Sequence, residues 1–155
     1  MRLAFAMLAD FAEATPDGKV TIGGGDFDTM YAPAFPAVHP RTVALVMKYI
    51  ADAADLGMPH VLRIEFVGPN GQLVAPPFDV QFTPQPHQLP IDVPTKLAFV
   101  FNFQALLLPT SGTYHFRVIL DEAAEPIASL PLYALEQPRP PARGQDEIPR
   151  EEGTP

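Results

Sequence analysis

The sequence predicts an all-β protein: an antiparallel Greek-key β-sandwich, immunoglobulin-like or C2-like, with about 7–9 strands. Three observations support this fold class. Apolar and polar residues alternate with a period of two through most of residues 1–136, as expected for strands with one buried face. The 20 prolines among 155 residues punctuate these segments and argue against long helices. Helical periodicity is convincing nowhere, and the best candidate is a short turn around residues 51–56.

The first expected strand covers residues 2–14, and a Thr-Pro-Asp-Gly turn follows at residues 15–18. The second strand covers residues 19–22 and runs into Gly23-Gly24-Gly25, where the missing side chains indicate a bulge or a close backbone approach. It resumes through residues 27–31. The apolar residues of one parity in the first strand are expected to face inward; they are Leu3, Phe5, Met7, Ala9 and Phe11.

Six further segments alternate in the same way. They cover residues 42–51, 60–67, 78–82, 96–105, 114–120 and 127–135. Pro69-Asn70-Gly71 predicts a hairpin turn of the Asn-Gly kind, with Gly71 as a structural residue. Pro131 marks an edge or a bulge in the last strand. The alternating phenylalanines of residues 99–103 are expected to face the core rather than to bind a carbohydrate.

The segment Pro109-Thr110-Ser111-Gly112-Thr113-Tyr114 resembles the turn and tyrosine corner of immunoglobulin-like sandwiches. That resemblance implies a buried Tyr114 hydroxyl that bonds back to the backbone near the start of its strand. We therefore assign Tyr114 and Gly112 structural roles.

The composition changes near Gln137, which divides the chain into a β-sandwich domain (residues 1–136) and a Pro-rich tail (residues 137–155). The tail holds five prolines, seven charged residues and one large aliphatic residue, Ile148. Because such a segment buries too little apolar surface to offset the entropy of ordering, we predict that it is disordered. The net charge of the chain is −8, and the tail's three arginines and four acids leave −7 on residues 1–136.

Composition excludes several classes of function. Without cysteine there is no disulfide, thiolate nucleophile or Cys-ligated metal site. Three lysines and seven dispersed arginines on an acidic chain argue against nucleic acid and anionic membranes as partners. No apolar stretch is long enough for a transmembrane segment. The short apolar run after Arg2 imitates an export signal, but the strand interpretation is favoured and the expected location is cytoplasmic.

Asp26 and Asp28, after the three glycines, are the only metal-ligand candidates, and they are weak ones. A calcium site needs six to eight oxygens. The others would have to come from loops that contain Asp52 and Asp55, or Asp121, Glu122 and Glu125, as in C2-like sandwiches. Carboxylates facing solvent beside a bulge explain both residues without a metal.

No catalytic motif is present. The four histidines lack the spacing of a local metal site, and neither serine lies in a nucleophile motif. An enzyme with a dispersed loop site would require Asp26, His39 or His60 to converge in a deep pocket. We predict no catalytic residue, no cofactor and no enzymatic activity.

Over residues 1 to about 135, the chain resembles a family of small uncharacterised bacterial proteins classed only as a domain of unknown function. The resemblance rests on LAFAMLADFAEATPDGKVTIGGGDFDTM, the segment at residues 34–40, HVLRIEFVGPNGQ, SGTYHFRVILDE and LPLYAL. It implies a single β-sandwich domain with an immunoglobulin-like core and transfers no catalytic residue.

The sequence therefore predicts a non-enzymatic binding or interaction module whose partner is an unknown protein or a second copy. The alternative is a calcium- or small-ligand-binding sandwich that uses loop carboxylates. Membership of a larger particle or secretion apparatus, with the tail as a tether, is a further possibility. Edge strands would support self-association, limited by Pro131 and Pro76-Pro77.

Overall fold

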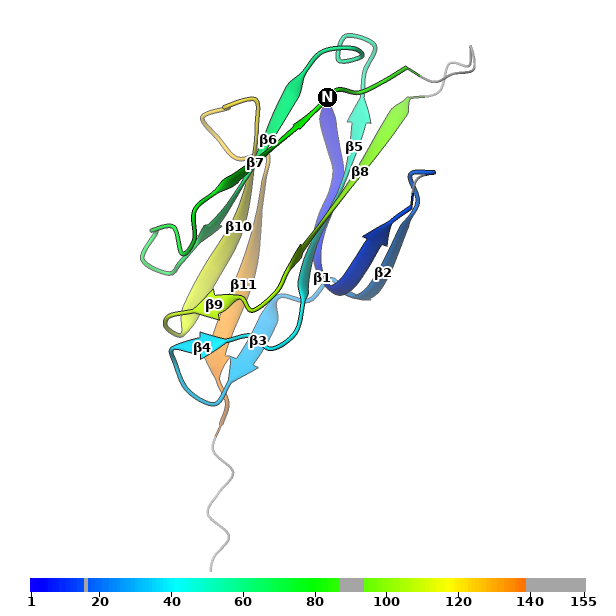
Figure 1. Cartoon of the computed structure of the whole chain (residues 1–155). Coiled ribbons are helices and arrows are strands. Elements are labelled where there is room, and N and C mark those ends of the chain that lie inside the picture. Colours follow the sequence, from blue (N-terminus) through cyan, green and yellow to red (C-terminus); the bar gives the residue numbers. More distant parts are fainter. Residues whose placement is uncertain (16, 87–93, 139–155) are drawn as a thin grey trace, which may run out of the picture.

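A computed structural model describes residues 1–15, 17–86 and 94–138, and these residues form a β-sandwich (Figure 1). One sheet has the order β2-β1-β5-β8 and the other the order β3-β11-β10-β6-β7, and β4 and β9 form a small third sheet. The strands are β1 (Arg2–Ala14), β2 (Val20–Gly25), β3 (Thr29–Ala32), β4 (Ala37–Val38), β5 (Val43–Ala51), β6 (His60–Val67), β7 (Phe78–Phe82), β8 (Thr95–Phe103), β9 (Leu107–Leu108), β10 (Gly112–Leu120) and β11 (Ala128–Glu136).

The predicted fold class is confirmed, with two additions. β3 and β11 pair in parallel, so the sheets are not wholly antiparallel. The small β4–β9 sheet was not expected, because two-residue strands carry no periodic signal. Of the predicted tail, only Gln137 and Pro138 lie within the described residues, and the rest lies outside them.

The core lies between the two large sheets. Alternate residues of β5, including Leu45 and Met47, meet Phe116 and Val118 of β10 and Leu62 of β6, all with no exposed surface. The phenylalanines of β8 pack against this cluster, so their predicted role in the core is confirmed.

The predicted inward face of β1 is correct at Leu3, which packs against the main core, and wrong from Phe5 onward. A register shift lies between Leu3 and Phe5 in the pairing with β5, so that Ala6 and Leu8 face the main core instead. Phe5, Met7 and Ala9 belong to a second apolar cluster, and Phe11 is 51% exposed. After the register shift, the residues of β1 that face the main core are therefore those of the other parity, Ala6 and Leu8.

The second cluster forms because the β1–β2 hairpin covers part of the outer face of the β5–β8 pair. Val20 and Ile22 of β2 pack there with Ala44 and Val46 of β5. The Asn102 side chain of β8 donates a hydrogen bond to the Ala12 carbonyl of β1, 3.2 Å away. Burial on both sides explains why residues 43–47 of β5 are all buried.

The three glycines allow a close approach within this hairpin. Gly24 has a φ of +61°, and a Cβ atom there would lie 2.3 Å from the Asp10 carboxylate. Glycine adopts this positive φ without strain and has no Cβ to meet Asp10, whereas any other residue would incur both costs.

Pro131 lies at a local sheet edge, as the sequence indicated. β3 pairs only with residues 133–136 of β11, so β11 is uncovered at Pro131 on that side. The Tyr133 N–H points toward β3, because it donates to the Asp28 carbonyl. Residues two apart in a strand point their N–H groups the same way, so the N–H that Pro131 lacks would have faced the uncovered edge.

Candidate functional site

The side of the sandwich formed by β7 and β8 is open. β8 ends one sheet and β7 ends the other, and no described strand pairs with their outer edges. Contacts between the two strands place these edges on the same side: the rings of Phe82 and Phe99 are 4.9 Å apart, and those of Phe78 and Phe101 are 5.3 Å apart. We call the free edge of β8, residues 95–103, the β8 edge.

The four strands that end the large sheets differ in how well they are protected against pairing with another chain. β3 has four residues, β7 has five and follows Pro76-Pro77, and β2 ends in three glycines. Short strands, prolines and glycines all limit edge pairing. β8 has nine residues, contains no proline or glycine, and carries one charge, Lys96, at its start. Of the four strands that end the large sheets, β8 is the least protected.

The side chains of β8 leave apolar surface at this edge. Leu97, Phe99, Phe101 and Phe103 contact the core but are only partly buried, and on the other face Ala98 and Val100 are partly buried as well. Residues 97–103, LAFVFNF, combine high β-propensity with no charge, which is the composition of segments that add readily to other strands.

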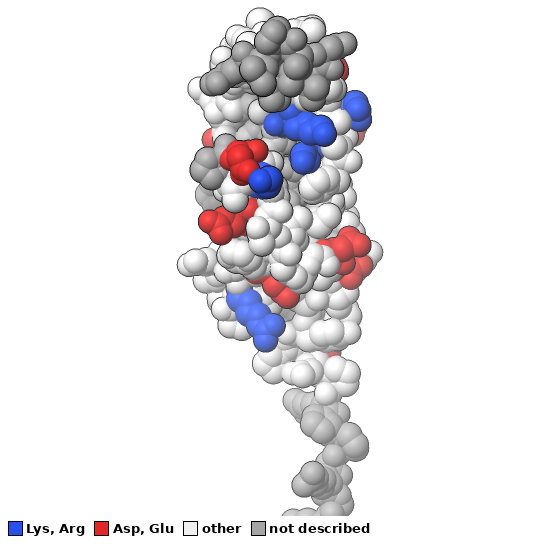
Figure 2. Space-filling model, turned by 90° about the vertical axis from the view of Figure 1, so that its right-hand side faces the viewer, with Lys and Arg blue, Asp and Glu red and all other residues white. Residues whose placement is uncertain are grey.

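Charged groups are dispersed on the side of the molecule that carries β2. Figure 2 views the side that lies to the right in Figure 1, where β2 and β8 lie, and shows mostly uncharged surface with dispersed charged side chains. The acidic character of the domain is therefore not concentrated here.

The two groups of carboxylates that the calcium hypothesis combined lie at opposite ends of the sandwich. Asp28 is beside Tyr133, whose partner Thr113 is near the start of β10, whereas Asp121 directly follows the end of β10. A strand rises about 3.3 Å per residue, so roughly 25 Å separates them. One site cannot contain both groups. Within the described part of the chain, no three His, Asp or Glu side chains are placed to hold a metal ion.

The Asp121 carboxylate instead links the loop after β10 to the start of β6 through hydrogen bonds. Its carboxylate accepts hydrogen bonds from the Val61 N–H at 2.9 Å and lies 2.7 Å from Nδ1 of His60. Burial would raise the pKa of Asp121, but these two partners outweigh it and the pKa is lowered. The His60 ring stacks on Phe82, with centroids 5.6 Å apart. These contacts give His60 a structural role in the fold.

His39 lies in a shallow hollow of about 450 Å³ at the opposite end, together with Asp10, Arg41 and the exposed Tyr31. Burial lowers the pKa of His39, Arg41 lowers it further, and Asp10 opposes both. Neither Asp26 nor His60 lines this hollow. The convergence of Asp26, His39 and His60 that a dispersed catalytic site would need is absent from it.

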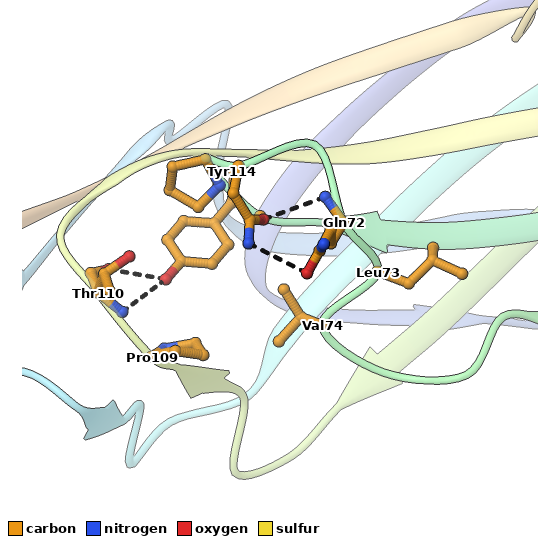
Figure 3. Close-up of a pocket in the computed structure, with 9 residues that line it drawn as sticks. Gln72, Leu73, Val74, Pro109, Thr110 and Tyr114 are labelled. Carbon is orange, nitrogen blue, oxygen red and sulfur yellow. Dashed lines mark hydrogen bonds between the residues drawn. The ribbon is translucent and has the colours of Figure 1, made fainter.

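A second hollow, of about 520 Å³, lies between the turn after β6 and the start of β10 (Figure 3). The Tyr114 hydroxyl donates to the Thr110 carbonyl at 2.7 Å and accepts from the Thr110 N–H at 3.1 Å, which is the geometry of a tyrosine corner. The side chains of Asn70 and Gln72 bond to each other. The main polar groups that line this hollow are therefore already hydrogen-bonded to one another.

The turn beside this hollow is longer than the two-residue Asn-Gly type. The Gly71 N–H donates to Gly68, and the Gly68 N–H donates to Gln72, which closes a three-residue loop over Pro69, Asn70 and Gly71. The returning chain forms one bridge, between Val67 and Leu73, and pairs fully with β6 only from Phe78 onward. Gly112 packs against this loop: a Cβ there would lie 2.7 Å from Cγ of Pro69.

A family model matches residues 4–135, which include β2 to β10 and nearly all of β1 and β11. It describes a family of unknown function, DUF6941. The chain belongs to this family. The DUF6941 match ends at Leu135, one residue before β11 ends, in agreement with the extent of the resemblance seen in the sequence. No curated protein matches the chain.

The β8 edge lies inside the DUF6941 match and is the surface that sequence reasoning missed. Alternation identifies a strand but does not say whether it is central or at an edge. The one signal was compositional, since residues 97–103 lack the charges and prolines found near the other edges. No described helix is long and apolar enough to cross a membrane.

Proposed function

We propose that this domain is a non-enzymatic interaction module that binds protein by adding an extended strand to the β8 edge. The observation that supports the proposal is the contrast among the sheet edges: three are short or interrupted by proline or glycine, and β8 is long, apolar and uninterrupted. A bacterial origin, an immunoglobulin-like core and a cytoplasmic location are parts of the same proposal.

Strand addition suits this edge for two reasons. An edge strand presents a row of unpaired N–H and C=O groups, and a partner strand that pairs with them supplies main-chain hydrogen bonds at every second residue. The alternating side chains then set the specificity, because Leu97, Phe99 and Phe101 offer large apolar side chains on one face, whereas the other face carries the smaller Ala98 and Val100. A partner strand with apolar residues of matching parity would extend the aromatic layer between the sheets.

The carboxylate alternative receives less support. Its ligands would have to come from Asp26 and Asp28 alone, or from the loops of Asp55 and Asp121 at the other end, where Asp55 already pairs with the N-terminal ammonium group of Met1 at 2.8 Å. Asp28 already accepts a hydrogen bond from the Thr29 hydroxyl, and both oxygens of Asp121 are engaged. Neither group approaches the six oxygens that calcium requires.

A peptide probe tests the proposal. A fluorescent peptide with the sequence of residues 95–103, carrying a short polyethylene glycol chain at each end, is titrated with the full chain, and its anisotropy is measured. We expect saturable binding that a peptide of scrambled sequence does not show. A98K/N102K places two lysines on the β8 edge and should weaken binding at least roughly tenfold, because lysines oppose edge pairing.

The matched control is S129K/Y133K, which adds two lysines at exposed positions on β11. It should bind the peptide as the wild type does. Absence of saturable binding, or equal loss in both double variants, would refute strand addition at β8.

A further inference from the structure

We infer that the strand bound at the β8 edge is β8 of a second copy of this chain, so that two sandwiches pair antiparallel about a two-fold axis. This inference rests on the proposed function and names its partner. In such a dimer, the two four-stranded sheets become one continuous sheet of eight strands. The contact is closed, because each copy uses the same surface and no further edge is created.

The strand's own length indicates the register. β8 spans Thr95–Phe103, and its middle residue is Phe99. Antiparallel pairing with the two-fold axis at Phe99 aligns all nine residues of each copy. In this register Leu97 lies opposite Phe101 of the second copy, and Ala98 lies opposite Val100.

The register also keeps apolar side chains together. In an antiparallel pair, directly opposed residues lie on the same face. Each residue here is opposed by one of the same parity, so the core-facing aromatic residues of both copies form one row. Their partial exposure in the single chain is then explained, since the second copy covers the side of the rings that β5 and β7 leave open.

The charges of β8 do not oppose this register. The single charge of β8, Lys96, lies opposite the neutral Asn102 of the second copy, and both side chains are exposed on the outer face. The two Lys96 residues are six residues apart along the paired strands, or roughly 20 Å. The acids that give residues 1–136 a charge of −7 lie outside the strand. Self-pairing therefore brings no like charges into direct opposition.

Two substitutions at Asn102 test the inference through opposite charges. In N102D, each new carboxylate faces Lys96 of the other copy, and in N102K each new ammonium faces a lysine. Both variants lose the amide that donates to the Ala12 carbonyl; a lysine can still donate to that carbonyl and an aspartate cannot, so any effect of this contact disfavours N102D and opposes the expected order. We expect the dimer dissociation constant of N102K to exceed that of N102D at least roughly fivefold, since each effect occurs twice per dimer.

The general charge of the protein predicts the reverse order. N102D makes an acidic chain more acidic and N102K makes it less so, so non-specific repulsion between copies would weaken N102D and strengthen N102K. The measured order therefore separates the proposed pairing from a general effect of charge. A third variant, K96D/N102K, reverses both partners and should restore the dissociation constant of N102D to within about threefold.

The measurement is sedimentation equilibrium of the full chain and its variants over roughly 1 µM to 500 µM, with circular dichroism confirming that each variant is folded. A wild type that is monomeric throughout this range would overturn the second copy as the partner. Equal dissociation constants for N102D and N102K, or the reverse order, or no rescue by K96D/N102K, would overturn the β8 register. A monomeric chain that still binds the β8 peptide would refute this inference alone, whereas loss of peptide binding as well would refute the proposed function.

Discussion

Replacing Tyr114 with Phe removes one hydroxyl, keeps the ring, and so isolates two hydrogen bonds of the tyrosine corner. The ring of Tyr114 is fully buried and stacks on Phe66, with centroids 5.3 Å apart. The hydroxyl both donates to and accepts from the backbone of Thr110. After Tyr114→Phe, the ring still packs, but a part-buried N–H and C=O of Thr110 have lost their partner.

The expected magnitude follows from these two bonds. A typical intramolecular hydrogen bond contributes about 0.5–1.5 kcal/mol net, so the loss of two should lower the free energy of unfolding by about 1–3 kcal/mol. Tyr49 provides the matched control, because it is also fully buried. Its hydroxyl contacts only Sδ of Met47, 3.8 Å away, and thioether sulfur is a weak acceptor. Tyr49→Phe should therefore change stability by no more than about 0.5 kcal/mol, or raise it.

Equilibrium urea unfolding at pH 7, followed by circular dichroism, measures both variants against the wild type. The expected result is a lower urea midpoint for Tyr114→Phe, an unchanged slope, and a gap of about 1–3 kcal/mol between the two variants. A gap below about 0.5 kcal/mol would show that the corner hydrogen bonds add nothing beyond ring packing, and the reasoning would fail.

Two further predictions concern the buried Tyr49 and the glycines Gly112 and Gly71. Burial raises the pKa of Tyr49 above the usual value near 10, so the stability that its protonated form contributes is complete below about pH 10 and is lost as the pH rises further. Urea midpoints measured from pH 8 to 11 should fall more steeply for the wild type than for Tyr49→Phe, and parallel curves would contradict this. Gly112→Ala should cost about 2–4 kcal/mol, because its φ of +138° is unfavourable for alanine and the new Cβ would meet Pro69 at 2.7 Å. Gly71→Ala has open space around it and should cost only about 1 kcal/mol in the same urea assay, and equal losses would show that the contact with Pro69 relaxes freely.

Much of the fold follows from local patterns in the sequence. The strand at residues 60–67 was predicted with its observed bounds, and the first strand likewise, because alternation, prolines and glycines act within a few residues of one another. The face of β1 could not be read in this way. Parity separates two sets of residues but does not say which set meets the main core when both faces of a strand are covered. One signal was available in β5, since the continuous apolar run at residues 43–47 is typical of a strand buried on both sides.

Pairing between strands that are distant in the sequence was harder to predict than the strands themselves. The parallel pairing of β3 with β11 joins residues about a hundred positions apart, and no local signal specifies it. The separation of Asp28 from Asp121 has the same origin, since it depends on which end of β10 each loop meets. The aspartates were recognisable as candidates from sequence, but their failure to converge was a property of topology.

The β8 edge differs from the other strands that end the large sheets, and the net charge of the chain makes that difference important. A chain with a net charge of −8 is repelled by its own copies, and this repulsion disfavours random contact. Short length, prolines or glycines limit pairing at β2, β3 and β7. Charged side chains also limit edge pairing, and the exposed positions Lys96 and Asn102 of β8 could both carry them. β8 lacks these protective features apart from Lys96, and this leaves a route by which an extended strand can approach and pair at that end of the sheet.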